Sequence, residues 1–181
     1  MNEVIFGNGL FSITAQNLEL IEEAPLHSQL EIVLAGEGWE LQALRGSETL
    51  SIVASRLADF AGNSASRHWG SFVGLGTIEE TIDRVRRHAF GGENPAQGEF
   101  FRWDMSSAFG NYSLSSCFDN GLGVEQAISV RGVKHETLIW QSLGGEIRSA
   151  SIKNARFDET FSSFVDWASA LLETGSARDG V

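Results

Sequence analysis

The sequence predicts a single α+β domain over residues 1–175, in which a mainly antiparallel sheet of short strands is packed by two or three helices. Its length of 181 residues and its 42% content of hydrophobic residues suit one hydrophobic core. Short β-prone runs are separated by turns rich in glycine and asparagine, and residues 77–90 and 158–173 have the pattern of helices. We expect the small, polar residues 176–181 to fray.

The first part of the chain has the pattern of two β-hairpins. Residues 4–14 contain two β-prone runs around a Gly-Asn-Gly turn, and residues 30–42 alternate on either side of a Gly-Glu-Gly turn. The outward positions of the second hairpin include Glu31 and Glu40, and Glu37 lies in its turn. The pattern therefore predicts that acidic side chains gather on one face.

Segment 47–61 fits either a strand or a helix. We favour a helix, because apolar residues recur there at helical spacing and the segment contains no proline or glycine. Ser47 is a suitable N-cap, and Gly62 followed by Asn63 is a suitable stop.

Two further helices have clearer signals. Thr77 and Glu80 form a capping box, and the residues after them place acids first and arginines last, which matches the helix dipole over 77–90. An apolar stripe predicts the last helix over 158–173, with Asp158 as its cap.

The region between these two helices breaks into five short β-like pieces. Turns that contain glycine or asparagine divide them at the spacing of an antiparallel meander, and we expect the last helix to close over the resulting sheet. The predicted strands are residues 100–105, 112–118, 124–130, 137–141 and 146–152.

The charge of the chain narrows the classes of partner. Its 24 acidic and 13 basic residues give a formal net charge of −11. Polyphosphates and anionic lipid surfaces are repelled by such a chain, so nucleic acids and membranes are disfavoured. A basic protein is the electrostatic complement, although acidity also serves solubility alone in many cytosolic proteins.

Cysteine usage and the N-terminal sequence favour the cytoplasm. Cys117 is the only cysteine, so no internal disulfide forms, and this suits a reducing compartment. The first residues lack the basic start and apolar run of a secretory signal, and no stretch approaches about 18 apolar residues.

No motif has the spacing of a metal, cofactor or catalytic site. The four histidines lack H-x-x-x-H spacing, and the single cysteine has no C-x-x-C partner. No G-x-S-x-G elbow occurs, and a lone cysteine in a β-like run is typical of a small buried residue. We therefore predict no catalytic residue, metal ion or cofactor, and favour a protein without enzymatic activity.

An acidic protein-binding module is the function that the sequence favours. Over the whole chain, its size and charge resemble the general type of bacterial immunity or antitoxin-like inhibitors that block a basic toxin enzyme, which implies a basic partner. In such an inhibitor, carboxylates speed the encounter with a positive cleft and buried aromatic residues hold it. The candidate partner-binding residues are Glu31, Glu37 and Glu40 for steering and Trp39 as the anchor.

The alternative is a small-molecule-binding or enzymatic domain with an apolar pocket under the C-terminal helix. Its candidate lining residues are Phe101, Trp103 and Trp140. The first two also fit the inward face of a strand. A filled core with an exposed acidic patch favours the binding module, and a roomy cavity favours the pocket. The oligomeric state is left open by the sequence.

Overall fold

The computed structural model describes residues 3–20, 27–65, 126–141 and 145–176, together with residues 68, 77, 79, 80, 82, 83 and 114. Within them, two antiparallel sheets are packed by two helices, so the predicted α+β class is confirmed. In chain order, the elements are β1 (Glu3–Asn8), β2 (Phe11–Leu20), β3 (His27–Gly36), β4 (Trp39–Thr49), α1 (Leu50–Gly62), β5 (Gln126–Arg131), β6 (His135–Gln141), β7 (Ile147–Lys153) and α4 (Asn154–Ser176).

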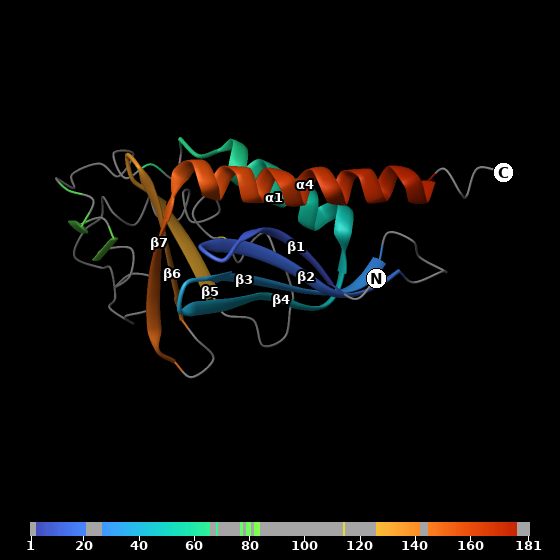
Figure 1. The fold of residues 1–181 in the computed structure, drawn as a ribbon, viewed down its shortest axis with the longest axis horizontal. Helices are drawn as coiled ribbons and strands as arrows, with labels where there is room; N and C mark the ends of the chain where they lie inside the picture. The colour runs from blue at the N-terminus through green and yellow to red at the C-terminus, as the bar shows by residue number, and fades with distance from the viewer. Residues whose placement is uncertain are drawn as a thin grey trace, which may run out of the picture.

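Figure 1 shows how the two sheets share the helices. The first sheet has the strand order β1-β2-β3-β4, and both helices lie over the same face of it. The second sheet, β5-β6-β7, stands at the end of the molecule away from the C-terminus, and its strands run across those of the first sheet. Helix α4 follows β7 directly and extends back over the first sheet.

Both N-terminal hairpins are confirmed. The β1–β2 pairing closes at Asn8 and Phe11, and the Asn8 side-chain oxygen accepts a hydrogen bond from the Leu10 N–H at 3.1 Å. The β3–β4 pairing closes at Gly36 and Trp39. A β-turn connects these two residues, and Gly38 takes a φ of 75°, a conformation that favours glycine.

A bulge in β4 explains how apolar residues that break strict alternation all reach the core. Val33 pairs with Gln42 and Ile32 pairs with Leu44, so one extra residue lies between the two pairs on β4. Leu41 and Leu44, an odd and an even position, are consequently both buried.

The second sheet confirms three of the predicted strands. β5, β6 and β7 match the predicted strands 124–130, 137–141 and 146–152 within two residues at each end. The predicted strand 100–105 lies outside the described residues. Leu114 is the one described residue of the predicted strand 112–118, and it lies in a buried 3₁₀ turn, so the strand prediction is wrong there.

The first helix begins after its expected N-cap, Ser47. Ser47 belongs to β4, which continues to Thr49 and pairs there with His27 of β3. Sheet pairing therefore overrides the capping preference, and the prediction of Ser47 as the cap is wrong. Helix α1 starts at Leu50 instead, and the expected stop at Gly62 is confirmed.

The last helix begins four residues before its expected cap, Asp158. Its first residue is Asn154, whose N–H donates to the Lys134 carbonyl at 2.9 Å and whose side-chain nitrogen donates to the Gly132 carbonyl at 3.0 Å. These bonds fix the start of α4 against the β5–β6 turn. The Asp158 carboxylate binds Arg131 instead of capping the helix, so that prediction is wrong.

The start of the predicted helix 77–90 is confirmed. The Glu80 N–H donates to the Thr77 hydroxyl at 3.1 Å, which is the expected capping bond, and residues 79, 80, 82 and 83 are helical. The rest of this segment lies outside the described residues. In the part of the chain that the structure describes, no helix has the length and apolarity needed to cross a membrane.

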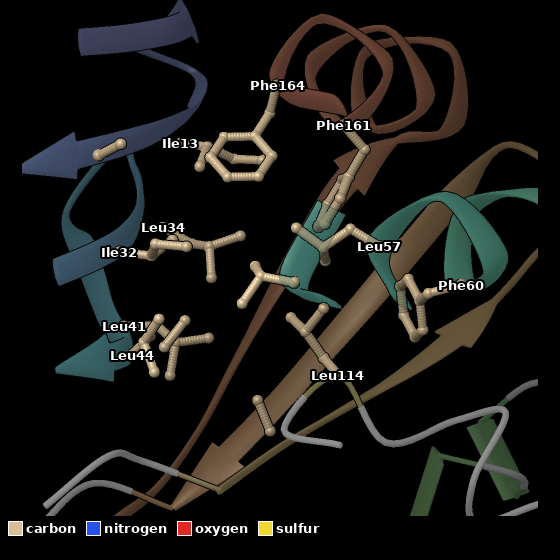
Figure 2. Close-up of a cluster of buried hydrophobic side chains, with 14 of the residues drawn as sticks. Ile13, Ile32, Leu34, Leu41, Leu44, Leu57, Phe60, Leu114, Phe161 and Phe164 are labelled. Atoms are coloured by element: carbon tan, nitrogen blue, oxygen red, sulfur yellow. The ribbon is translucent and has the colours of Figure 1, made fainter. Parts of the chain in front are cut away.

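The hydrophobic core lies between the first sheet, α1 and α4, and Figure 2 shows its centre. Phe161 and Phe164 project from α4, and Phe60 joins them from α1. Phe157 of α4 belongs to the same core, and all three phenylalanines of α4 are wholly buried. The aliphatic side chains of the sheet that meet them include Ile13, Ile32, Leu34, Leu41 and Leu44.

Aromatic contacts connect this core from strand to helix. Phe11 of β2 stacks on Phe157 with 5.5 Å between ring centroids. Phe157 contacts Phe161 at 4.5 Å, and Phe161 contacts Phe60 of α1 at 6.0 Å. Phe164 packs edge-on against Phe6 of β1 at 5.5 Å. Such pairs stabilise beyond the burial of their area.

We expect Phe164→Ala to lower the free energy of unfolding by about 3–5 kcal/mol, because it removes a wholly buried ring and its contact with Phe6. Chemical denaturation measures this change, with Asp166→Ala, an exposed position of the same helix, as the control. Equal stabilities of the two variants would contradict the packing of α4.

Candidate functional site

The outer face of the first sheet carries acidic residues. Away from the bulges, core residues alternate with residues that point away from the helices, and two of the latter, Thr14 and Val33, are themselves buried. The outward positions include Glu3 of β1, Glu31 of β3 and Glu40 of β4. Glu3 and Glu40 are exposed, and within the described part of the chain neither forms an ion pair. Exposed Ile5, at 59% of its full accessibility, lies on the same face.

The predicted partner-binding residues are divided between two faces. Glu31 is half-buried, and one of its carboxylate oxygens accepts a hydrogen bond from the Gln42 side chain at 2.6 Å. Glu40 shares this outer face. Trp39 precedes Glu40 in the strand and points to the opposite, inner side, whereas Glu37 is exposed in the turn. The structure therefore brings Trp39 together with Glu37 and separates it from the other two carboxylates.

Trp39 connects the two sheets. Its indole is half-buried and lies 5.3 Å, between ring centroids, from Trp140 of β6 and 6.2 Å from Phe11. A Cβ atom at Gly36 would come within 2.5 Å of the Trp39 indole nitrogen, so the strand needs glycine opposite this ring. The predicted anchor, Trp39, thus contacts the predicted pocket residue, Trp140.

Of the three residues predicted to line a pocket under the C-terminal helix, the structure describes Trp140 alone. Trp140 is wholly buried, and its indole N–H has no hydrogen-bond partner among the described residues. Phe101 and Trp103 lie outside the described residues. The side of α4 that faces the first sheet is packed with phenylalanine side chains (Figure 2).

A groove of about 450 Å³ lies where the two sheets meet. One wall consists of the hairpin tips of the first sheet, with Leu10, Glu37 and Trp39. The other wall consists of His135 and of five consecutive residues of β7, Ser149–Lys153, and the first turn of α4 adds Arg156.

The charge of this groove is opposite to that of the whole chain. The cations Lys153 and Arg156 line it, with Glu37 as the acidic lining residue, and His135 adds an imidazole ring. Within the described part of the chain, none of the three basic residues forms an ion pair. Arg156 donates a hydrogen bond to the neutral side chain of Asn8, which holds the guanidinium without cancelling its charge.

Sequence reasoning missed this groove. No motif of the sequence singles out His135, Lys153 or Arg156. The three residues come from separate positions, and the tips of two hairpins complete the site. The sequence holds one partial signal, which is that both lysines of the chain, Lys134 and Lys153, flank predicted strands of one sheet.

A second charged cluster joins β5, β6 and α4. The Arg131 guanidinium donates two hydrogen bonds to Asp158, at 2.8 and 2.6 Å, and a third to Glu136 at 3.2 Å. Glu136 is wholly buried and also accepts a hydrogen bond from the Ser129 hydroxyl. The hydrogen bonds to Asp158 raise the pKa of Arg131 above its usual value, against the opposing effect of burial, so the guanidinium stays charged.

This cluster holds the fold together at the start of α4. Arg131 binds the Asp158 carboxylate in bidentate geometry and also donates to the buried Glu136. The buried charge of Glu136 is therefore paired, as buried charges require. Among the described side chains, no group of three His, Cys, Asp or Glu residues is arranged to hold a metal ion.

We expect Gly36→Ala to destabilise the protein by about 1–3 kcal/mol, because the added methyl group collides with the Trp39 indole. Gly9→Ala is the matched control, since a Cβ atom there meets nothing within 4 Å. Denaturation curves of both variants test this. A Gly36→Ala protein as stable as the control would contradict the close contact.

We expect Arg131→Met to cost about 3–5 kcal/mol, because it leaves the Glu136 carboxylate buried without its cation. Adding Glu136→Gln should recover part of this loss. Asp158→Asn should cost less than about 1 kcal/mol, since Asp158 is 43% exposed. Unfolding free energies of the four proteins, wild type included, form the test, and no recovery in the double variant would refute the coupling.

The described residues thus offer two candidate surfaces, the outer face of the first sheet with Glu3, Glu31 and Glu40, and the groove between the sheets with Lys153 and Arg156. In comparisons with known proteins, no family model, no curated protein and no solved structure matches the chain.

Proposed function

We propose that the chain is a non-catalytic protein-binding module that presents the outer face of its first sheet to a basic partner. The observation that carries this proposal is the placement of Glu3, Glu31 and Glu40 on one sheet face, opposite the face that the two helices cover. Exposed Ile5 gives the same face an apolar contact point.

Electrostatics supports a role for this face in finding the partner. Exposed carboxylates steer a cationic surface toward them and raise association rates, and a net charge of −11 adds attraction at longer range. Glu31 is held by Gln42, so its charge has a fixed position when the partner arrives. A side chain that is already ordered loses less conformational entropy on binding than a mobile side chain.

The partner class we propose is a toxin enzyme with a basic active-site cleft, which the module would block as immunity and antitoxin-like inhibitors do. The carboxylates of the sheet face would be complementary in charge to such a cleft. We place the module in the cytoplasm, because its single cysteine suits a reducing compartment.

The alternative, a small-molecule pocket under the C-terminal helix, has less support. Phe157, Phe161 and Phe164 of α4 are buried in the core that the helix shares with the first sheet, and Trp140 is buried against Trp39. A pocket for a ligand needs a concave space with some convergent polar groups. The filled core therefore argues against a pocket between α4 and the first sheet, and the groove between the sheets lies outside that space.

We expect the double variant Glu3→Lys/Glu40→Lys to bind the basic partner much more weakly than the wild type does. A column of immobilised wild type should retain a basic protein from a low-salt cell extract, and the variant column should retain about tenfold less of it. With the purified partner, stopped-flow association rates should fall with salt for the wild type and depend less on salt for the variant.

The control is Asp59→Lys/Asp166→Lys, which changes the net charge equally at exposed positions of α1 and α4. It should retain the partner nearly as well as the wild type. If both double variants retain equally little of the partner, net charge alone determines binding. If the Glu3/Glu40 variant retains as much as the wild type, the interface does not lie on this face.

A further inference from the structure

We propose that the groove between the sheets binds an extended acidic peptide segment, which adds as a strand along the open edge of β7. The site is separate from the acidic sheet face, and the charge of its occupant is opposite to that of the partner proposed for that face. It therefore stands or falls independently of the proposed function.

The lining of the groove shows that the edge of β7 faces it. Side chains of successive strand residues point to opposite faces of a sheet. Ser149, Ala150, Ser151, Ile152 and Lys153 nevertheless all line the same groove, although Ile152 is buried in the core and Lys153 is exposed. Five consecutive residues reach one groove when the strand presents its edge.

This edge is open for pairing in the described structure. β7 pairs with β6 on one side, from Ile147 opposite Gln141 to Lys153 opposite His135, and no other described strand pairs with it. An edge strand has a row of N–H and C=O groups without strand partners, and an added peptide satisfies them. The small side chains of Ser149, Ala150 and Ser151 leave space beside the backbone.

The length of the groove favours a peptide over a compact anion. Five strand residues, with a rise of about 3.3 Å each, extend over about 13 Å. A segment of about five extended residues matches this length. A compact anion such as inorganic phosphate is much shorter than this length and would leave most of the groove empty.

The charges and apolar groups select the side chains of that peptide. Lys153 and Arg156 attract carboxylates, and Arg156 is already oriented by its hydrogen bond to Asn8. Glu37 opposes them from the hairpin wall. On the same wall, Leu10, 57% exposed, and half-buried Trp39 offer contacts to apolar residues. Alternating apolar and acidic residues therefore fit the site.

The test uses a fluorescent peptide of about seven residues in which valine alternates with aspartate or glutamate. Fluorescence anisotropy measures its binding to the full chain. We expect Lys153→Glu to weaken binding about tenfold and Glu37→Gln to strengthen it. Lys134→Glu is the matched control, because it changes the other lysine, which is exposed and does not line the groove.

Main-chain pairing is tested by a second peptide of the same sequence, N-methylated at two adjacent central residues. Neighbouring N–H groups of a strand point to opposite edges, so this peptide cannot pair fully along either edge. It should not bind. Hydrogen exchange should also slow at alternate amides of β7 when the unmodified peptide is added.

The outcomes separate the proposal from its rivals. Weaker binding by Lys153→Glu but not Lys134→Glu, together with β7 protection and loss of binding on N-methylation, supports strand addition. Undiminished binding of the N-methylated peptide, or equal effects of the two lysine variants, overturns it in favour of a general attraction between charges. Absence of binding up to about 1 mM peptide also overturns it. None of these results depends on the Glu3/Glu40 face.

Discussion

A continuous row of aromatic rings holds the two sheets and the two helices in one arrangement. It begins at Trp140 of the second sheet, passes to Trp39 and Phe11 of the first, and continues to the buried phenylalanines of α4 and to Phe60 of α1. Apart from the contact between Phe157 and Phe161 within α4, each contact joins two different elements. Since aromatic rings bury large apolar areas, the stabilisation that this row supplies depends on both sheets and both helices being in place at once.

The groove is a consequence of the same row. Trp39 is close to Trp140 only if the β3–β4 hairpin tip reaches the second sheet, and the absence of a side chain at Gly36 lets the indole lie there. On the other wall, Asn154 fixes the start of α4 against the β5–β6 turn, and this placement brings Arg156 beside β7. The walls are therefore positioned by the core and by helix anchoring.

Local patterns in the sequence were sufficient for much of the fold and for little of the site. Alternation and turn residues identified both N-terminal hairpins, and the capping box at Thr77 forms its expected bond. The helix starts at Ser47 and Asp158 were mispredicted because tertiary partners took those residues, β3 in one case and Arg131 in the other. Capping propensity is a weak local preference, and sheet pairing or a bidentate ion pair outweighs it.

The groove and the acidic face lie beyond such patterns for a further reason. Which face of β4 turns toward the core, the one with Trp39 or the one with Glu40, depends on how the helices pack on the sheet, and whether β7 has an open edge depends on strand order. Neither follows from the sequence of one strand.

The electrostatic attractions that act at the two surfaces differ in the distance over which they reach. At distance, the net charge of −11 attracts a basic partner and repels an acidic segment, but at physiological salt this field decays over about 8 Å. An acidic peptide within that distance meets the local field of Lys153 and Arg156, and main-chain pairing adds to it without any dependence on net charge.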